Sequence, residues 1–214
     1  MDVGRIWGRN SPKAVREIIS RQSSMEMLSD DSMSKNSNVT GGCKRLNSSE
    51  KTLLESVNIS IPDGYCLSAG LGIYKLHEDL ATWNKARKIC IKEGAHLAIV
   101  NSQQESEMLA NMFKHSNLMK YEHRESVVVF LGFHDLYQEG EFVTIFDDSL
   151  DKVGYSTWSK GYGGQPDNGR VSGQGKGSQN CGALVTDGGL DDVGCSWDLG
   201  FICEIPIRQS ASLA

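Results

Sequence analysis

The spacing of apolar residues predicts two amphipathic helices in the middle of the chain. The first begins after the capping residue Thr82, continues to Ile91 and is stopped by Gly94. The second begins at the capping box formed by Ser102 and Glu105. The residues expected to face the core are Trp83, Ala86 and Cys90 in the first helix and Met108, Leu109, Met112 and Phe113 in the second.

Short apolar runs bounded by glycine and polar residues predict strands. The continuous apolar run 127–132 is typical of a strand that is buried on both faces. Glycines crowd between residues 154 and 179, which indicates a long irregular loop, and such loops in compact domains often carry function. The expected strands cover residues 72–76, 96–100, 127–132, 142–146, 182–185 and 200–204.

The first part of the chain has a different composition. Residues 20–60 are rich in Ser and Asn and bury too little apolar surface to offset the entropy of ordering, so we expect residues 1–61 to form a flexible extension. This stretch holds N-glycosylation sequons at Asn38, Asn47 and Asn58. Residues 1–20 do not form the apolar run of a signal peptide, so we expect a missing leader or a misassigned start.

The net charge of the chain is −5, and it is unevenly distributed. Residues 61–214 carry 13 Lys or Arg and 20 Asp or Glu, a net charge of −7. This balance argues against nucleic acid as a partner and suits a cation site. No window reaches the roughly 18 consecutive apolar residues of a transmembrane helix.

Six cysteines at wide spacing, with no CxxC pair, favour disulfides over a zinc ribbon or a thioredoxin-type site. Disulfides imply an oxidising compartment, so we expect a secreted, extracellular protein. We expect no enzyme and no catalytic residue. The sequence has no HExxH, no GxSxG and no phosphate-binding glycine loop, and its five histidines are placed for packing.

Four motifs follow one another along the chain: Val129-Phe130-Leu131-Gly132, Gln165-Pro166-Asp167-Asn168, Leu190-Asp191-Asp192 before Cys195, and Phe201-Ile202-Cys203-Glu204. In their residues and their order, the stretch from Tyr74 to Pro206 resembles the C-type lectin-like domain. The resemblance implies an α+β fold, with two helices flanking small antiparallel sheets and a long calcium- and sugar-binding loop. The expected domain spans 62–207 and leaves a short tail, 208–214. The segments 72–77 and 132–136 look most like insect haemolymph lipopolysaccharide-binding lectins.

The resemblance also implies cysteine pairs. Cys90 should bond Cys203, which ties the first helix to the last strand, and Cys181 should bond Cys195 within the loop region. Cys43 and Cys66 are 23 residues apart, farther than in the family's N-terminal hairpin. They either bond each other or leave one thiol to link two chains.

The resemblance implies a Ca²⁺ site, because calcium prefers six to eight oxygen ligands. Carried over by position, the metal ligands are Gln165, Asp167, Gln179, Asp191 and Asp192. Pro166 takes the place of the family's cis-proline. Gln179 replaces the family's Glu and Asp191 replaces its Asn, so the number of carboxylates is kept. The opposite reading is that the loop has drifted and binds no metal.

In the family, sugar hydroxyls bind the ion and the side chains around it. The expected sugar-binding residues are Gln165, Asp167, Gln179 and Asp191, and Tyr162, Arg170 and Lys176 are further candidates beside them. Gln-Pro-Asp accompanies galactose-type ligands in the family. The cations Arg170 and Lys176 could contact acidic groups of bacterial glycans.

These observations predict a calcium-dependent lectin that recognises microbial surface glycans such as lipopolysaccharide in innate immunity. A single shallow sugar site is weak, so we expect a homo-oligomer that gains affinity by multivalency. The alternative is a calcium-independent module of the same fold that binds a protein partner.

Overall fold

The computed structural model describes residues 39–40, 43–56, 61–68, 70–120, 127–161, 163–169 and 179–205. In this part, strands join in one mixed sheet and three α-helices lie beside it. The strands are β1 (Val39–Thr40), β2 (Cys43–Arg45), β3 (Cys66–Ser68), β4 (Gly72–Ala81), β5 (His96–Leu97), β6 (Val128–His134), β7 (Val143–Thr144), β8 (Cys181–Val185), β9 (Leu190–Val193) and β10 (Leu199–Ile205). The helices are α2 (Ser48–Glu55), α3 (Trp83–Lys92) and α4 (Gln103–Lys114), with 3₁₀ turns η2 (Asn117–Lys120) and η4 (Leu150–Lys152).

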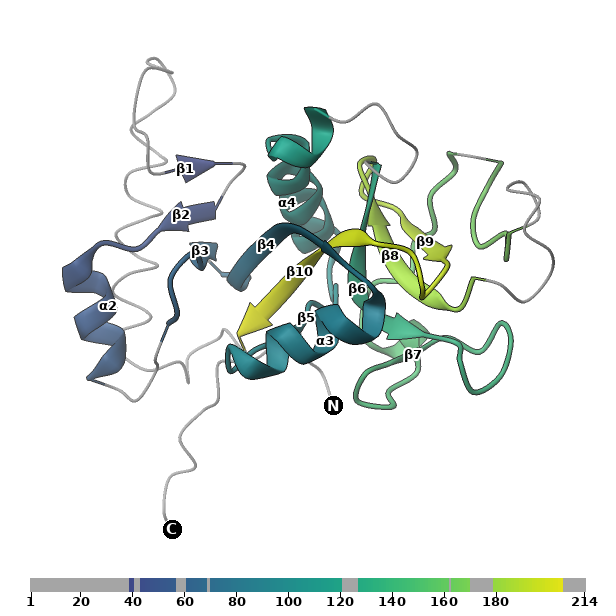
Figure 1. Cartoon of the computed structure of the whole chain (residues 1–214), viewed down its shortest axis with the longest axis horizontal. Helices are drawn as coiled ribbons and strands as arrows, with labels where there is room; N and C mark the ends of the chain where they lie inside the picture. The colour runs from purple at the N-terminus through teal and green to yellow at the C-terminus, as the bar shows by residue number, and fades with distance from the viewer. Residues whose placement is uncertain are drawn as a thin grey trace, which may run out of the picture.

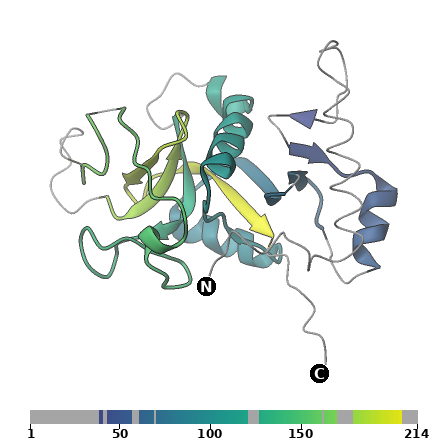
Figure 2. The same ribbon diagram turned by 180° about the vertical axis from the view of Figure 1, so that it is seen from behind.

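The last strand of the chain, β10, lies in the middle of the sheet (Figure 1). The strand order is β1-β2-β3-β4-β10-β6-β8-β9, with β5 paired to β10 and β7 paired to β6. The pairs are antiparallel except β10 with β6, which run parallel where Phe201 meets Phe130. The N-terminal strands and α2 therefore lie at one end of the sheet, and β8 and β9 at the other, as both views show (Figures 1 and 2).

The two predicted helical stripes are buried, as the apolar spacing predicted. Helix α3 buries Trp83, Ala86 and Cys90, and α4 buries Met108, Leu109, Met112 and Phe113. The two stripes belong to two separate buried clusters. Strand β10 contributes to both, with Phe201 in the cluster of α3 and Ile202 in the cluster of α4. Each fully buried large side chain contributes about 1.5–3 kcal/mol to folding.

The expected flexible extension differs from the structure between residues 39 and 56. Strands β1 and β2 extend the sheet next to β3, and α2 follows at once. Helix α2 starts with a capping box in which the Asn47 side chain accepts from Glu50 N at 2.9 Å and Glu50 accepts from Asn47 N at 3.0 Å. Composition could not predict these elements, because Leu46 and Leu54 are buried in a cluster with residues far along the chain. Asn38, Asn58 and the tail 208–214 lie outside the described residues.

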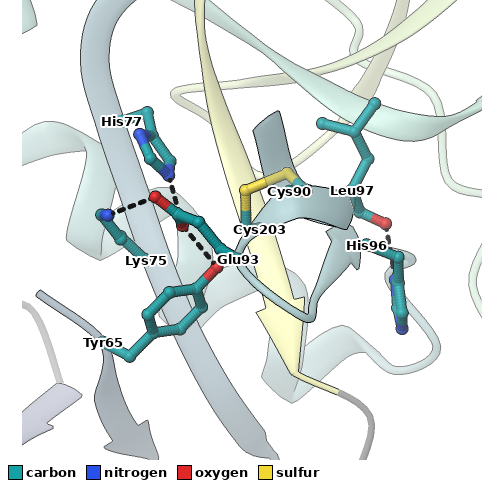
Figure 3. The surroundings of a disulfide bond; sticks show 8 residues. All are labelled: Tyr65, Lys75, His77, Cys90, Glu93, His96, Leu97 and Cys203. Atoms are coloured by element: carbon teal, nitrogen blue, oxygen red, sulfur yellow. Dashed lines mark hydrogen bonds and ion pairs between the residues drawn. A yellow bond between two sulfur atoms is a disulfide. The ribbon is translucent and has the colours of Figure 1, made fainter. Parts of the chain in front are cut away.

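Three disulfides hold these elements together. Cys90–Cys203 joins α3 to β10, Cys181–Cys195 joins β8 to the turn after β9, and Cys43–Cys66 joins β2 to β3. Figure 3 shows the Cys90–Cys203 bond between the end of α3 and the central strand. The first two are the pairs that the resemblance implies, and the third is one of the two alternatives left open by the sequence.

Some local expectations were wrong in detail. Thr82 precedes α3 but makes no capping hydrogen bond with its side chain. Ser102 does cap α4, yet Glu105 turns away from it and accepts from Tyr74 Oη and Asn101 N. Strand β5 ends at Leu97 rather than at residue 100. Strand β9 was not expected, because two aspartates interrupt its apolar pattern.

Candidate functional site

The candidate site is built on the loop that precedes β8. Here the chain turns at Gly163, Gly164 and Gly169, which have positive φ, and the Gln165–Pro166 peptide bond is cis. Asn168 also has a positive φ of 48°, a conformation that asparagine tolerates better than most residues.

Asp192 on β9 fixes this loop to the sheet. Its Oδ1 accepts from Asp167 N at 2.9 Å, and its Oδ2 accepts from Asn168 N at 2.7 Å. The side chain is almost fully buried, at 1% exposure. Hydrogen bonds to a charged acceptor are about twice as strong as neutral ones, so Asp192 is the main anchor of the loop.

Asn168 and Gly169 complete the connection. Asn168 Oδ1 accepts from Gln179 N at 3.2 Å, which links the loop to the residues before Cys181. Gly169 N donates to Asp167 Oδ1 at 2.9 Å, and Asp167 N donates to Gln165 Oε1 at 3.0 Å. Asn168 was not among the expected site residues. Its tolerance of a left-handed backbone beside a glycine was the one available indication of its role.

A small hollow lies among these residues. Its volume is about 10 Å³, which is about the room that one water molecule or one ion requires. Gly194 leaves space for the Trp197 ring that forms one wall, because a Cβ there would lie 2.5 Å from Trp197 Nε1. The residues that line the hollow are Val127, Val128, Gln165, Gln179, Asp191, Val193 and Trp197.

The donor set around the hollow fits a cation. Gln179 is buried, and its Oε1 accepts no hydrogen bond within the described part of the chain. An unmade hydrogen bond at a buried oxygen costs about 1–3 kcal/mol, so this atom calls for a positive partner. Asp191 also lines the hollow, and Asp167 and Asp192 are buried beside Gln165, to which hydrogen bonds through Asp167 N join them. Burial raises the pKa of Asp192, and the charge of Asp167 adds to the effect, while backbone hydrogen bonds oppose it.

The structure brings together the five residues carried over as metal ligands, through the hydrogen bonds around Asp192 and the lining of the hollow. Two of them, Asp191 and Asp192, lie on the unexpected strand β9. Three further sugar-binding candidates, Tyr162, Arg170 and Lys176, lie outside the described residues. No described helix is long and apolar enough to cross a membrane.

Comparison with known proteins relates this arrangement to one family. Residues 79–205 match the model of the lectin C-type domain. The chain is 44% identical over 149 residues to a hemolymph lipopolysaccharide-binding protein of Periplaneta americana. That alignment covers 69% of this chain and 54% of the cockroach protein. Salivary C-type lectin 2 of Aedes albopictus is 29% identical over 137 residues, which are 61% of this chain and 82% of that protein.

Solved structures agree with the fold. The carbohydrate-recognition domain of the mouse scavenger receptor C-type lectin superposes with a TM-score of 0.51 at 25% identity, covering 67% of this chain and 95% of that one. The lectin CEL-I from Cucumaria echinata superposes with a TM-score of 0.52 at 22% identity, covering 69% and 98%. These comparisons confirm the resemblance that the four motifs indicated. The chain belongs to the C-type lectin domain family.

Proposed function

We propose that this protein is a secreted lectin whose calcium-dependent site recognises microbial surface glycans. The observation that carries the proposal is the buried Gln179 Oε1 beside a hollow of ionic size, with Gln165 and Asp191 in the same wall. Proteins with this domain are generally binding proteins, so the site is read as a place where a ligand docks and no bond is broken.

Gln165, Asp167, Gln179, Asp191 and Asp192 would hold the calcium ion. When bound, the ion would offer coordination positions to two neighbouring sugar hydroxyls. The chain's own groups would then orient the sugar: carboxylates such as Asp167 accept from hydroxyl protons, whereas the amides of Gln165 and Gln179 can both donate and accept. Asp192 holds the loop in place by accepting hydrogen bonds from two of its backbone N–H groups.

The ligand class rests on two observations. Gln165 and Asp167 flank Pro166 in the order that accompanies galactose-type ligands in the family, so we propose a galactose-type sugar. The relative that is 44% identical is named for binding lipopolysaccharide, which favours bacterial glycans and a part in innate immunity. Because the chain spans about half the length of that relative, this assignment concerns the shared domain.

The location and assembly follow from the same features. Three disulfides favour an oxidising compartment, and a relative named for hemolymph favours secretion. The Asn47 sequon lies on an exposed turn before α2, where a glycan has room. We further propose a homo-oligomer, because several weak sugar sites together give useful affinity.

The test is a calorimetric calcium titration of the full chain and of Asp192→Asn. The substitution removes the charge and keeps an oxygen for one of the two backbone N–H groups that Asp192 binds. We expect saturable binding in the wild type and about a 10- to 100-fold loss in the variant. The matched control is Asp187→Asn, which changes an exposed carboxylate in the turn between β8 and β9. Calcium-dependent retention on immobilised galactose, reversed by a chelator, is the second readout.

A calcium-independent module that binds a protein is the second candidate. Asp192 already binds two backbone N–H groups, so the loop is held without a metal. The departures from the family's pattern at Gln179 and Asp191 also favour it. If the wild type shows no saturable calcium binding and is not retained on immobilised galactose, the first proposal fails and this one is favoured.

A further inference from the structure

Helix α3 carries an unusual concentration of positive charge. Its ten residues include Lys85, Arg87, Lys88 and Lys92 and contain no Asp or Glu. The helix therefore holds four of the 13 cations in residues 61–214, a region with a net charge of −7. A local concentration of this kind creates a positive potential on one side of an acidic domain.

Three of these cations lie in one row on the outer side of the helix. Lys85, Lys88 and Lys92 are spaced by three and four residues, so they share one face. At 1.5 Å per residue, the row is about 10 Å long. All three are exposed, and the side chains that face the core, Trp83 and Cys90 among them, occupy the opposite face. We call this row, with Ile91 beside it, the α3 basic face.

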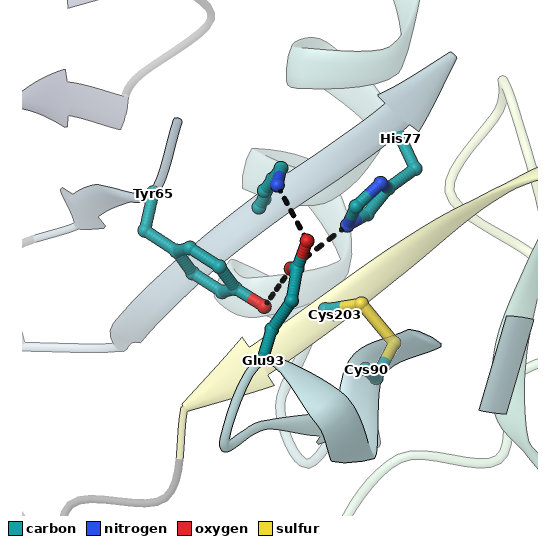
Figure 4. A network of polar contacts seen from close by, with 6 residues as sticks. Tyr65, His77, Cys90, Glu93 and Cys203 are labelled. Atoms are coloured by element: carbon teal, nitrogen blue, oxygen red, sulfur yellow. Dashed lines mark hydrogen bonds and ion pairs between the residues drawn. A yellow bond between two sulfur atoms is a disulfide. The ribbon is translucent and has the colours of Figure 1, made fainter. Parts of the chain in front are cut away.

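The carboxylate nearest in sequence does not neutralise this face. Glu93, directly after α3, turns toward β3 and β4 and accepts three hydrogen bonds (Figures 3 and 4). They come from Tyr65 Oη at 2.8 Å, Lys75 Nζ at 2.8 Å and His77 Nε2 at 3.1 Å. Burial acts to raise the pKa of Glu93, but these donors outweigh it and lower that pKa, so the carboxylate stays charged for its own partners.

The cations themselves are not paired. Within the part of the chain that the structure describes, Lys85, Lys88 and Lys92 form no ion pair, whereas Lys75 and Lys51 do. A row of unpaired cations on a convex helix can meet a flat array of anions, but it cannot enclose a small one. Ile91, which is 56% exposed, adds an aliphatic contact next to the row.

We infer that the α3 basic face docks onto a membrane surface that carries phosphate-bearing lipids. The negative charge of the phosphates complements the positive charge of the lysines. The exposed Ile91 fits the boundary between head groups and acyl chains, a contact that a nucleic acid or a free phosphate does not offer. No residue of this face lines the hollow beside β9, so the inference does not depend on the proposed lectin site.

The test is co-sedimentation of the full chain with vesicles in the presence of a chelator, which removes calcium from the comparison. One set of vesicles is pure phosphatidylcholine, and the other is an equal mixture with phosphatidylglycerol. We expect binding to the mixture alone, weakened by added salt. The triple variant Lys85→Gln, Lys88→Gln, Lys92→Gln should bind about a hundredfold more weakly, at about fivefold per lysine. Ile91→Ser should weaken binding several-fold.

The matched control is Lys114→Gln, Lys120→Gln, Lys152→Gln, which removes the same charge from exposed positions on α4, η2 and η4. It should bind like the wild type. Equal loss in both triple variants, or equal binding to both kinds of vesicle, would overturn the inference. Displacement by inorganic phosphate at the lipid phosphate concentration would also overturn it. Calcium titration of the first triple variant should match the wild type, so that failure here is separable from failure of the lectin proposal.

Discussion

At the scale of single residues, two buried carboxyl groups have no part in the candidate site. Glu105 accepts from Tyr74 Oη and from Asn101 N at 2.8 Å, and Glu204 accepts from Ile99 N at 3.3 Å. Burial raises the pKa of Glu105 to about 8, with a further contribution from the charge of Glu204. Burial of its carboxyl group raises the pKa of Glu204 to about 7.

These pKa values predict a pH-dependent stability. Both folded-state pKa values lie above the unfolded value of about 4.3, so the folded protein binds more protons and its free energy of unfolding falls as pH rises. The free energy of unfolding of the wild type should fall between about pH 5 and pH 8. In Glu204→Gln we expect this fall to be smaller by on the order of 2 kcal/mol. Urea unfolding at several pH values, with a chelator present, measures this. Glu107→Gln, an exposed change on α4, should keep the wild-type slope. Equal slopes for Glu204→Gln and wild type would contradict the assignment.

At the scale of elements, α3 and α4 are both preceded by a residue with a hydroxyl group, but only one of the two hydroxyls caps its helix. Ser102 Oγ accepts from Glu105 N at 3.2 Å, so α4 has a side-chain cap. Thr82 makes no such bond, and α3 is instead held at its start by Trp83, whose N donates to Cys195 O at 3.1 Å. The first turn of α3 is therefore fixed by the loop that follows β9.

This difference predicts unequal effects of removing the two hydroxyls. Ser102→Ala should lower the free energy of unfolding by about 1 kcal/mol, the usual contribution of an N-cap. Thr82→Ala should lower it by less than about 0.5 kcal/mol, because no cap is lost. Chemical unfolding of the two variants side by side checks this. A larger loss at residue 82 than at residue 102 would mean that the threonine caps the helix in solution.

At the scale of the whole molecule, the disulfides close loops of very different size. Cys90–Cys203 spans 113 residues and encloses most of the domain, whereas Cys43–Cys66 spans 23 and closes only the N-terminal strands onto β3. Closing a longer loop removes more entropy from the unfolded chain. The central bond therefore restrains the fold, and the other restrains its edge.

Removing each bond by paired alanine substitutions should rank them. We expect Cys90→Ala with Cys203→Ala to cost about 4–5 kcal/mol, and Cys43→Ala with Cys66→Ala about 3 kcal/mol. Equilibrium unfolding in urea gives both values. A loss from the N-terminal pair that equals or exceeds the other would show that β1, β2 and α2 are more than an edge addition to the core.

The sequence by itself determined the two amphipathic helices. Their apolar residues recur at helical spacing, and this spacing is visible without knowing what the helices pack against. It also indicated the family, since four motifs in a fixed order survive much variation elsewhere. Short strands were less predictable. The strands expected at 96–100 and 142–146 are only two residues long, as β5 and β7, and β9 was not expected because Asp191 and Asp192 interrupt its apolar pattern.

Tertiary structure alone decided how distant residues meet. Asp192 anchors a loop about 25 residues earlier in the chain. Glu93 accepts from β4 and from the residue before β3, and Glu105 accepts from Tyr74 on β4. The order of residues 43–56 has the same origin, because their few apolar side chains become useful only against a core formed elsewhere. The local sequence pattern predicts helices and strands through their periodicity. Contacts between distant residues depend on which polar groups are buried and need hydrogen-bond partners, and this is decided only when the chain has folded.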